Sequence, residues 1–178
     1  MNKKFKNTGI LIIILFVLNI LGSYFYERFD LTADKRFTLS EITVNIVNDI
    51  LDPVEITVYL EGDFPAEFSR LQLETKQYLE ELASQNNLIN IRFENPDNQR
   101  EELIKRGMMP SQLTVQENGN LSEAIIFPWA EILYKNKSKS VSLLPDGILA
   151  SQEEQLQKAI ENLEYLFSSA LKQLLEKS

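Results

Sequence analysis

The chain has 178 residues, of which 44% are hydrophobic and 10% aromatic, enough to bury the core of one ordinary domain plus an appendage. Its 18 Lys and Arg residues against 26 Asp and Glu give a formal charge of −8, which argues against nucleic acid as a partner. The chain has no Cys and no His, which excludes disulfides, thiol redox chemistry, structural zinc sites and catalysis by Ser-His-Asp or Cys-His groups. We therefore expect a non-catalytic protein without a cofactor.

The first 26 residues predict a membrane anchor. Residues 7–26 carry no formal charge, and a helix of this length, at about 1.5 Å per residue, spans a bilayer core of roughly 30 Å. Lys3, Lys4 and Lys6 come before it, so the positive-inside rule predicts a cytoplasmic stub over residues 1–6 and an external body. A cleaved signal peptide and a buried helix are the alternatives, but no small-residue cleavage site follows. The predicted anchor residues are Ile10, Leu11, Ile12, Ile13, Ile14, Leu15, Phe16, Val17, Leu18, Ile20, Leu21 and Tyr24.

A linker and then a helix follow the predicted anchor. Residues 27–40 alternate in charge and scatter their apolar side chains, which is typical of an extended juxtamembrane linker. Thr38 followed by Glu41 fits a capping box, so a helix is expected from this point to Asp52-Pro53, opening an α/β domain over residues 41–150. The side chains expected on its buried face are Ile42, Ile46, Val47, Ile50 and Leu51.

A strand-helix-strand unit is expected next. Alternating apolar residues predict strands over Val54–Leu60 and Ile89–Phe93. An amphipathic helix is expected between Pro65 and Asn86, with an inner face formed by Phe68, Leu71, Thr75, Leu79 and Leu82. Such a unit predicts parallel strands joined by a right-handed crossover. A short helix from about Asn98 to Arg106, ended by Gly107, should follow.

The remainder of the domain predicts antiparallel sheet. Strands are expected over Gln112–Gln116, Ala124–Tyr134 and Ser140–Leu144, with Pro128 marking an edge or a bulge. The resulting β-α-β-α-β-β-β order is that of a thioredoxin-like sheet. Pro110 lies just before the third strand, where that fold uses a cis proline, although a trans bond is the commoner state of any X-Pro pair.

An amphipathic helix is expected over residues 151–178. Its apolar residues recur at steps of three and four: Leu156, Ile160, Leu163, Phe167, Ala170 and Leu174. This stripe needs a partner surface, which could be its own domain, an absent second domain or another chain.

Few side chains outside the anchor suggest chemistry. The close carboxylate pairs in predicted loops are Asp30 with Asp34, Asp49 with Asp52, and Glu94 with Asp97. None has the spaced oxygen ligands of a calcium loop, so we expect solvated turns and caps and no metal. Trp129 and Tyr134 could form a contact patch but are expected in the core. Lys135, Lys137 and Lys139 form a basic turn that fits an edge gatekeeper better than a site for an anionic partner.

Five stretches carry a family resemblance: RFDLTADKRFTLS, VEITVYLEGDFP, LETKQYLEEL, GMMPSQL and AIENLEYLFSSAL. Together they resemble the N-terminal part of the gliding-motility-associated ABC-transporter substrate-binding protein family (GldG) of Bacteroidetes. The most specific element directly follows the anchor and comprises Asp30, Leu31, Thr32, Phe37, Thr38, Leu39 and Ser40. We refer to these seven residues as the linker motif.

The resemblance implies a single-pass protein of the inner (cytoplasmic) membrane with its body in the periplasm. It implies an accessory subunit beside an ABC permease and its ATPase, with the linker motif as a possible partner contact. Relatives continue into a second domain and a C-terminal membrane helix, so we expect residues 151–178 to lead toward a domain absent here. An envelope interaction module without a transport role is the alternative, and a thioredoxin-fold enzyme is the weakest. The ligand, if any, stays unknown.

Overall fold

The computed structural model describes residues 38–62, 66–117, 120–144 and 151–176. The chain divides into two units, residues 1–35 and 36–178, and every described element belongs to the second. The predicted anchor, the three lysines before it and the linker motif up to Phe37 lie outside the described residues. No helix within the described ranges is long and apolar enough to cross a membrane.

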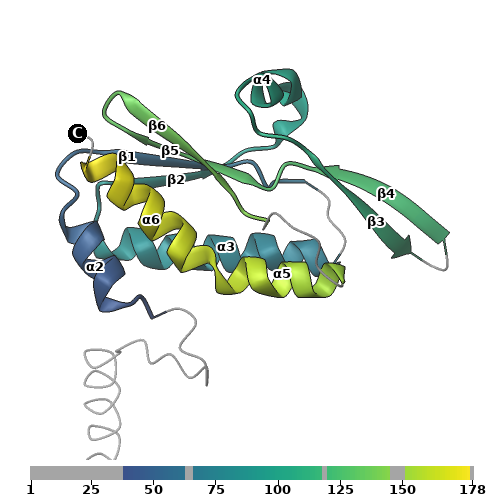
Figure 1. Ribbon diagram of the computed structural model, residues 1–178, viewed down its shortest axis with the longest axis horizontal. Helices are drawn as coiled ribbons and strands as arrows, with labels where there is room; N and C mark the ends of the chain where they lie inside the picture. The colour runs from purple at the N-terminus through teal and green to yellow at the C-terminus, as the bar shows by residue number, and fades with distance from the viewer. Residues whose placement is uncertain (1–37, 63–65, 118–119, 145–150, 177–178) are drawn as a thin grey trace, which may run out of the picture. The chain divides into compact units, whose positions relative to one another are not determined.

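A four-stranded mixed sheet forms the centre of this unit (Figure 1). Its strands are β1 (Val54–Val58), β2 (Ile89–Phe93), β5 (Trp129–Tyr134) and β6 (Lys137–Ser142), in the order β2-β1-β5-β6. β1 and β2 are parallel, whereas β5 pairs antiparallel with both β1 and β6. The predicted first two strands and their parallel pairing are confirmed. β2 and β6 form the two edges of the sheet.

Four helices cover one face of the sheet, and a fifth lies on the other face (Figure 1). The first group comprises α2 (Glu41–Asn48), α3 (Ala66–Gln85), α5 (Gln152–Glu161) and α6 (Leu163–Glu176). On the opposite face, α4 (Arg100–Lys105) follows the short 3₁₀ turn η1 (Pro96–Asn98). The short helix predicted in this region is therefore confirmed.

The main core lies between the sheet and the four helices that cover one of its faces, α2, α3, α5 and α6. The predicted inner face of α3 is confirmed, because Phe68, Leu71, Thr75, Leu79 and Leu82 are all at most 1% exposed. Burying a large apolar side chain stabilises a fold by about 1.5–3 kcal/mol, so this helix contributes a large part of the stability. A smaller cluster joins α4 to the opposite face through Tyr59, Leu103, Met108 and Phe127.

The segment predicted as one long strand, Ala124–Tyr134, is divided at Pro128. β4 (Asn120–Ile126) pairs with β3 (Ser111–Glu117) in a separate two-stranded ribbon, and β5 begins after the proline. Proline has no N–H to donate to a ladder. The chain instead turns here, with the Trp129 N–H donating to the Phe127 carbonyl at 2.8 Å. The prediction of a single interrupted strand, and the strand count that followed from it, were wrong.

The basic turn and the start of the last strand also differ from prediction. Only Lys135 and Asn136 form the turn, while Lys137 and Lys139 belong to β6. Lys135 has a φ of 54°, the left-handed conformation that two-residue hairpin turns of the primed type require. The predicted strand over residues 140–144 therefore begins three residues earlier. Every peptide bond in the described residues is trans, including the one before Pro110.

The C-terminal stripe is buried on its own domain, one of the three surfaces considered for it. Phe167 and Ala170 are at most 1% exposed, and the stripe residues Leu156, Leu163 and Leu174 belong to the main core. The single predicted helix is two helices, because α5 ends at its C-cap residue Asn162. That a further domain follows these helices stays a prediction.

Two residues predicted on the buried face of the first helix are exposed: Ile42 in α2, and Leu51, which lies beyond the end of α2 at Asn48. Ile42 is 73% and Leu51 is 81% exposed, whereas Thr43, Val47 and Ile50 are buried. Thr43 and Val47, four residues apart, form the buried face of α2. Ile42 comes one residue before this face and therefore points toward solvent.

Candidate functional site

The last residue of the linker motif is bound to the far end of the chain. The Glu164 carboxylate accepts hydrogen bonds from the Ser40 backbone N–H at 2.8 Å and from the Thr43 hydroxyl at 2.6 Å. The Ser40 hydroxyl lies 3.1 Å from that of Thr43 and accepts from the Thr43 N–H at 3.3 Å. We call Ser40, Thr43 and Glu164 the Glu164 clamp. It fixes the start of α2 against the first turn of α6.

The electrostatics of the clamp favour a charged Glu164. Partial burial acts to raise the pKa of this carboxyl, but the hydrogen bonds from Thr43 and Ser40 outweigh it, so the pKa is lowered from its ordinary value near 4.5. A carboxylate that accepts two hydrogen bonds at the N-terminus of a helix is also in the position where the helix dipole favours negative charge. Glu164 is therefore ionised at neutral pH, where its carboxylate accepts both hydrogen bonds.

Three linker-motif residues lie within the described part of the chain. Ser40, not Thr38, is the N-cap of α2, so the predicted capping box from Thr38 to Glu41 is wrong by two positions. Thr38 is exposed, and Leu39 packs partly buried against the main core. Asp30, Leu31, Thr32 and Phe37 are outside the described residues, and their role stays a prediction.

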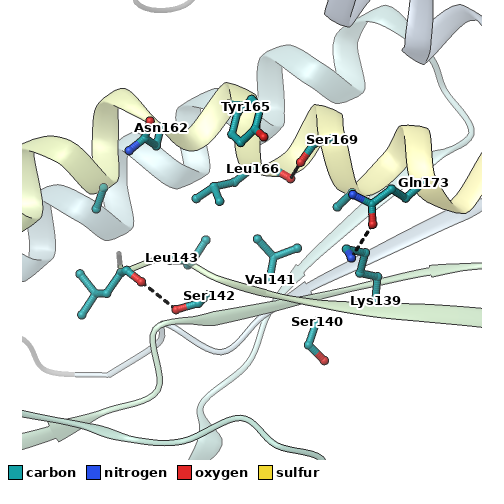
Figure 2. A pocket seen from close by; sticks show the side chains of 13 residues that line it. Lys139, Ser140, Val141, Ser142, Leu143, Asn162, Tyr165, Leu166, Ser169 and Gln173 are labelled. Atoms are coloured by element: carbon teal, nitrogen blue, oxygen red, sulfur yellow. Dashed lines mark hydrogen bonds between the residues drawn. The ribbon is translucent and has the colours of Figure 1, made fainter. Parts of the chain in front are cut away.

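A groove of about 430 Å³ runs between the edge strand β6 and the helices α5 and α6 (Figure 2). Its strand side is formed by the six consecutive residues 139–144. Its helix side includes Asn162, the C-cap residue of α5, and Leu166, Ser169 and Gln173, which recur at helical spacing along one side of α6. We call this the edge groove.

The floor of the edge groove is apolar and its rim is polar. Figure 2 shows Val141 and Leu143 pointing from the strand toward α6, with Leu166 above them. At one end the Lys139 ammonium donates to the Gln173 side-chain oxygen at 2.7 Å, a contact that joins strand to helix. At the other end the Ser142 hydroxyl donates to the Leu144 carbonyl at 2.8 Å. Val141 is 6% and Leu143 0% exposed, so both side chains belong to the main core, and Leu166 is the partly buried apolar residue that borders the groove.

The predicted carboxylate pairs take structural roles where the structure describes them. Asp52 pairs with Lys135 at 3.2 Å, and Asp97 pairs with Arg100 three residues later. Glu94 accepts a hydrogen bond from Gln99. No group of three acidic side chains able to hold a metal ion occurs in the described residues.

The aromatic residues singled out in the sequence belong to the core, as expected. Tyr134 is 3% exposed, and Trp129 packs against the cluster beneath α4. The Trp129 indole N–H donates to the Met109 carbonyl at 2.7 Å, so its one polar atom is satisfied within the fold. Neither residue forms an open contact patch.

The fold defines a mixed α/β domain in which no further described strand pairs with either edge of the four-stranded sheet. Residues 33–133 match a family described as a domain of unknown function (DUF7088), and the chain belongs to this family. The matched range begins in the linker and ends in β5, so β6, α5, α6 and the edge groove lie beyond it. Neither a curated protein nor a solved structure matches the chain.

Proposed function

We propose that this protein is a membrane-anchored, non-catalytic accessory subunit of an ABC transporter of the gliding-motility-associated substrate-binding type. Its α/β domain would lie in the periplasm, held to the inner membrane by residues 7–26. The Glu164 clamp is the observation that carries the proposal, because it binds the end of the linker motif to a core helix. Because Ser40 is bound to Glu164, the linker joins the domain at a fixed position on α6. Such an attachment suits a subunit that works beside a permease.

The fold class supports a binding rather than a redox role. We propose that the domain is thioredoxin-like, since the order β2-β1-β5-β6 with one parallel and two antiparallel pairs agrees with that arrangement. The ribbon of β3 and β4 would then be an insertion before β5. A thioredoxin-like domain without Cys has no thiol with which to exchange disulfides.

The partners that this proposal requires are a permease and its ATPase. Residues 27–40 would come nearest to the bilayer, so the linker motif is the proposed permease contact. The test is a mild-detergent pull-down of the tagged chain from its native membrane, with mass spectrometry of the recovered proteins. A chain with Asp30, Leu31 and Thr32 changed to Ala keeps the anchor, and Glu80→Ala on the exposed side of α3 is the matched control.

Recovery of a permease and ATPase with the unmodified chain and Glu80→Ala, but not with the motif variant, is the expected result. Recovery of envelope proteins without a permease from every variant would instead select the alternative function, an envelope interaction module. The open edge groove is the observation that favours this alternative, because it provides a recognition surface that does not depend on the membrane.

The proposed topology has its own test. Because the chain has no Cys, single cysteines at Asn2 and Ser84 can be labelled without background. A membrane-impermeant maleimide added to cells with a permeabilised outer membrane should label Ser84→Cys and leave Asn2→Cys unlabelled. Labelling of neither residue, or of Asn2→Cys alone, contradicts a periplasmic domain.

A further inference from the structure

The edge groove follows the hydrogen-bonding edge of β6. Successive residues of a strand point to opposite faces of the sheet, so a groove beneath one face would contact every second residue. This groove instead contacts all six residues from Lys139 to Leu144. It therefore runs alongside the strand, next to the backbone groups that β6 does not use.

Those backbone groups are available for pairing. β6 pairs with β5 on one side, and no other described strand pairs with it. In an antiparallel pair alternate residues direct their N–H and C=O groups away from the partner strand, so about half of those in β6 face outward. α6 lies against the same strand and forms the opposite wall of the groove. An edge strand beside a helix is the arrangement that accepts an extended peptide as an additional strand.

The positive charge at one end of the groove favours an acidic partner. Among the described residues, 13 line the groove, and they include one cation, Lys139, and no Asp or Glu, although the chain as a whole carries a formal charge of −8. Lys137 lies on the same face of β6 two residues earlier, and within the described residues it forms no ion pair. A second copy is disfavoured, because its β6 carries Lys137 and Lys139 but no Asp or Glu, so pairing of β6 with itself would supply no carboxylate for Lys139.

We propose that the edge groove binds an extended acidic segment of a partner protein, which joins the sheet as a fifth strand beside β6. Backbone hydrogen bonds to β6 supply the register. Apolar side chains on the α6-facing side of the segment lie against the partly buried Leu166, and a carboxylate on the same side replaces Gln173 as the partner of Lys139. The proposal is independent of membrane attachment and of the transporter assignment, because every residue involved belongs to the described domain.

The test uses the full chain in detergent micelles and a fluorescein-labelled Glu-Val peptide of repeated Glu-Ser-Val-Ser, in which Glu and Val lie on the same face of the extended peptide. Three further peptides serve as controls: a Lys-Val version and two versions in which the amides of one edge are N-methylated. Binding is measured by fluorescence anisotropy and mapped by amide chemical shifts. The acidic peptide should bind and shift residues 139–144 and the groove side of α6, while the Lys-Val version and one N-methylated version should not bind.

Two variants separate the groove from general electrostatics. Lys139→Glu should weaken binding about tenfold, which corresponds to loss and reversal of one charge contact. Lys172→Glu makes the same charge change on α6 at a residue that does not line the groove, and should alter binding less than twofold. Ser169→Phe fills the groove and should also abolish binding, with circular dichroism to show that the variant is folded.

Equal weakening by the two lysine variants, binding of both N-methylated peptides, or shifts confined to other elements would overturn the proposal. So would a complete lack of binding by the Glu-Val peptide. Concentration-dependent dimerisation that Ser169→Phe abolishes would show that a second copy occupies the groove, and would likewise refute an acidic partner segment.

Discussion

The Glu164 clamp gives the most direct prediction from the structure. Glu164→Ala removes the acceptor of two hydrogen bonds, from the Ser40 N–H and the Thr43 hydroxyl. Hydrogen bonds to a charged group are worth about 1.5–3 kcal/mol each when buried, but this carboxylate is only partly buried. Solvent screening reduces the expected loss to about 1–2 kcal/mol in the free energy of unfolding. Glu164→Gln keeps one oxygen acceptor and should lose about half as much.

The assay is urea unfolding of the full chain in detergent, followed by the fluorescence of Trp129, the single tryptophan. Glu80→Ala is the control, because Glu80 is exposed on α3 and the described residues provide no partner for it. Only Glu164→Ala should also speed hydrogen exchange at the amides of Ser40 and Thr43, which begin α2. Equal destabilisation by Glu80→Ala, or unchanged exchange at these two amides, would refute the clamp as a stabilising contact.

The pH dependence of the same contact has a definite sign. The folded-state pKa of Glu164 is lowered from its ordinary value near 4.5, so its contribution is complete above that value. It is lost as the pH falls through the folded-state pKa, because a protonated carboxyl no longer prefers the folded state. The stability difference between the unmodified chain and Glu164→Ala should therefore be constant from pH 7 to pH 6 and shrink below about pH 4. A difference that grows on acidification would contradict this.

Three further predictions concern the core. Phe167→Ala should lower the free energy of unfolding by about 3–5 kcal/mol, measured by urea unfolding, because the ring is fully buried and contacts Tyr78 at 5.6 Å between centroids. Asn86→Ala should cost about 2 kcal/mol in the same assay, since the Asn86 side chain donates to two carbonyls at the end of α2, whereas exposed Asn90→Ala should cost under about 0.5 kcal/mol. Tyr78→Phe should raise stability by up to about 1 kcal/mol, because the Tyr78 hydroxyl is buried without a hydrogen-bond partner among the described residues. Burial, aided by the charge of Glu164, raises the pKa of Tyr78, so the unmodified chain should lose stability as the pH rises above about 10, and Tyr78→Phe should lose less.

Local pattern was sufficient to predict the first half of the fold. The alternation in β1 and β2 and the helical period of α3 each lie within one element, and a crossover through a helix made parallel pairing the expected arrangement. Ala124–Tyr134 failed because its residues suit strands throughout, and sequence alone does not show that Pro128 sends the two halves into different sheets. Asn162 carries no strong helix-breaking signal, so the division between α5 and α6 was equally hidden.

The candidate sites depended on contacts that no local pattern reveals. Ser40 and Thr38 are both acceptable N-cap residues, and only the position of Glu164, 124 residues beyond Ser40, distinguishes them. The edge groove requires β6 to lie at the end of the sheet order and α6 to lie against it, which follows from the packing of five distant segments. The signal that was visible was the run of three lysines, which the sequence placed in a turn, whereas Lys137 and Lys139 lie in the edge strand β6.

The contact of the first described helix with the last has a consequence for how the domain is made. α2 packs on α6, and the core that they share extends from Val47 to Leu174. A chain that leaves the ribosome N-terminus first can form the unit of β1, α3 and β2 early, but α2 has no complete surface to rest on until α6 has been synthesised. Folding should therefore end with the closure of a loop of more than a hundred residues, a step whose entropic cost slows the final docking. Until α6 docks, the apolar side chains that the finished domain buries around Val47 stay exposed to solvent.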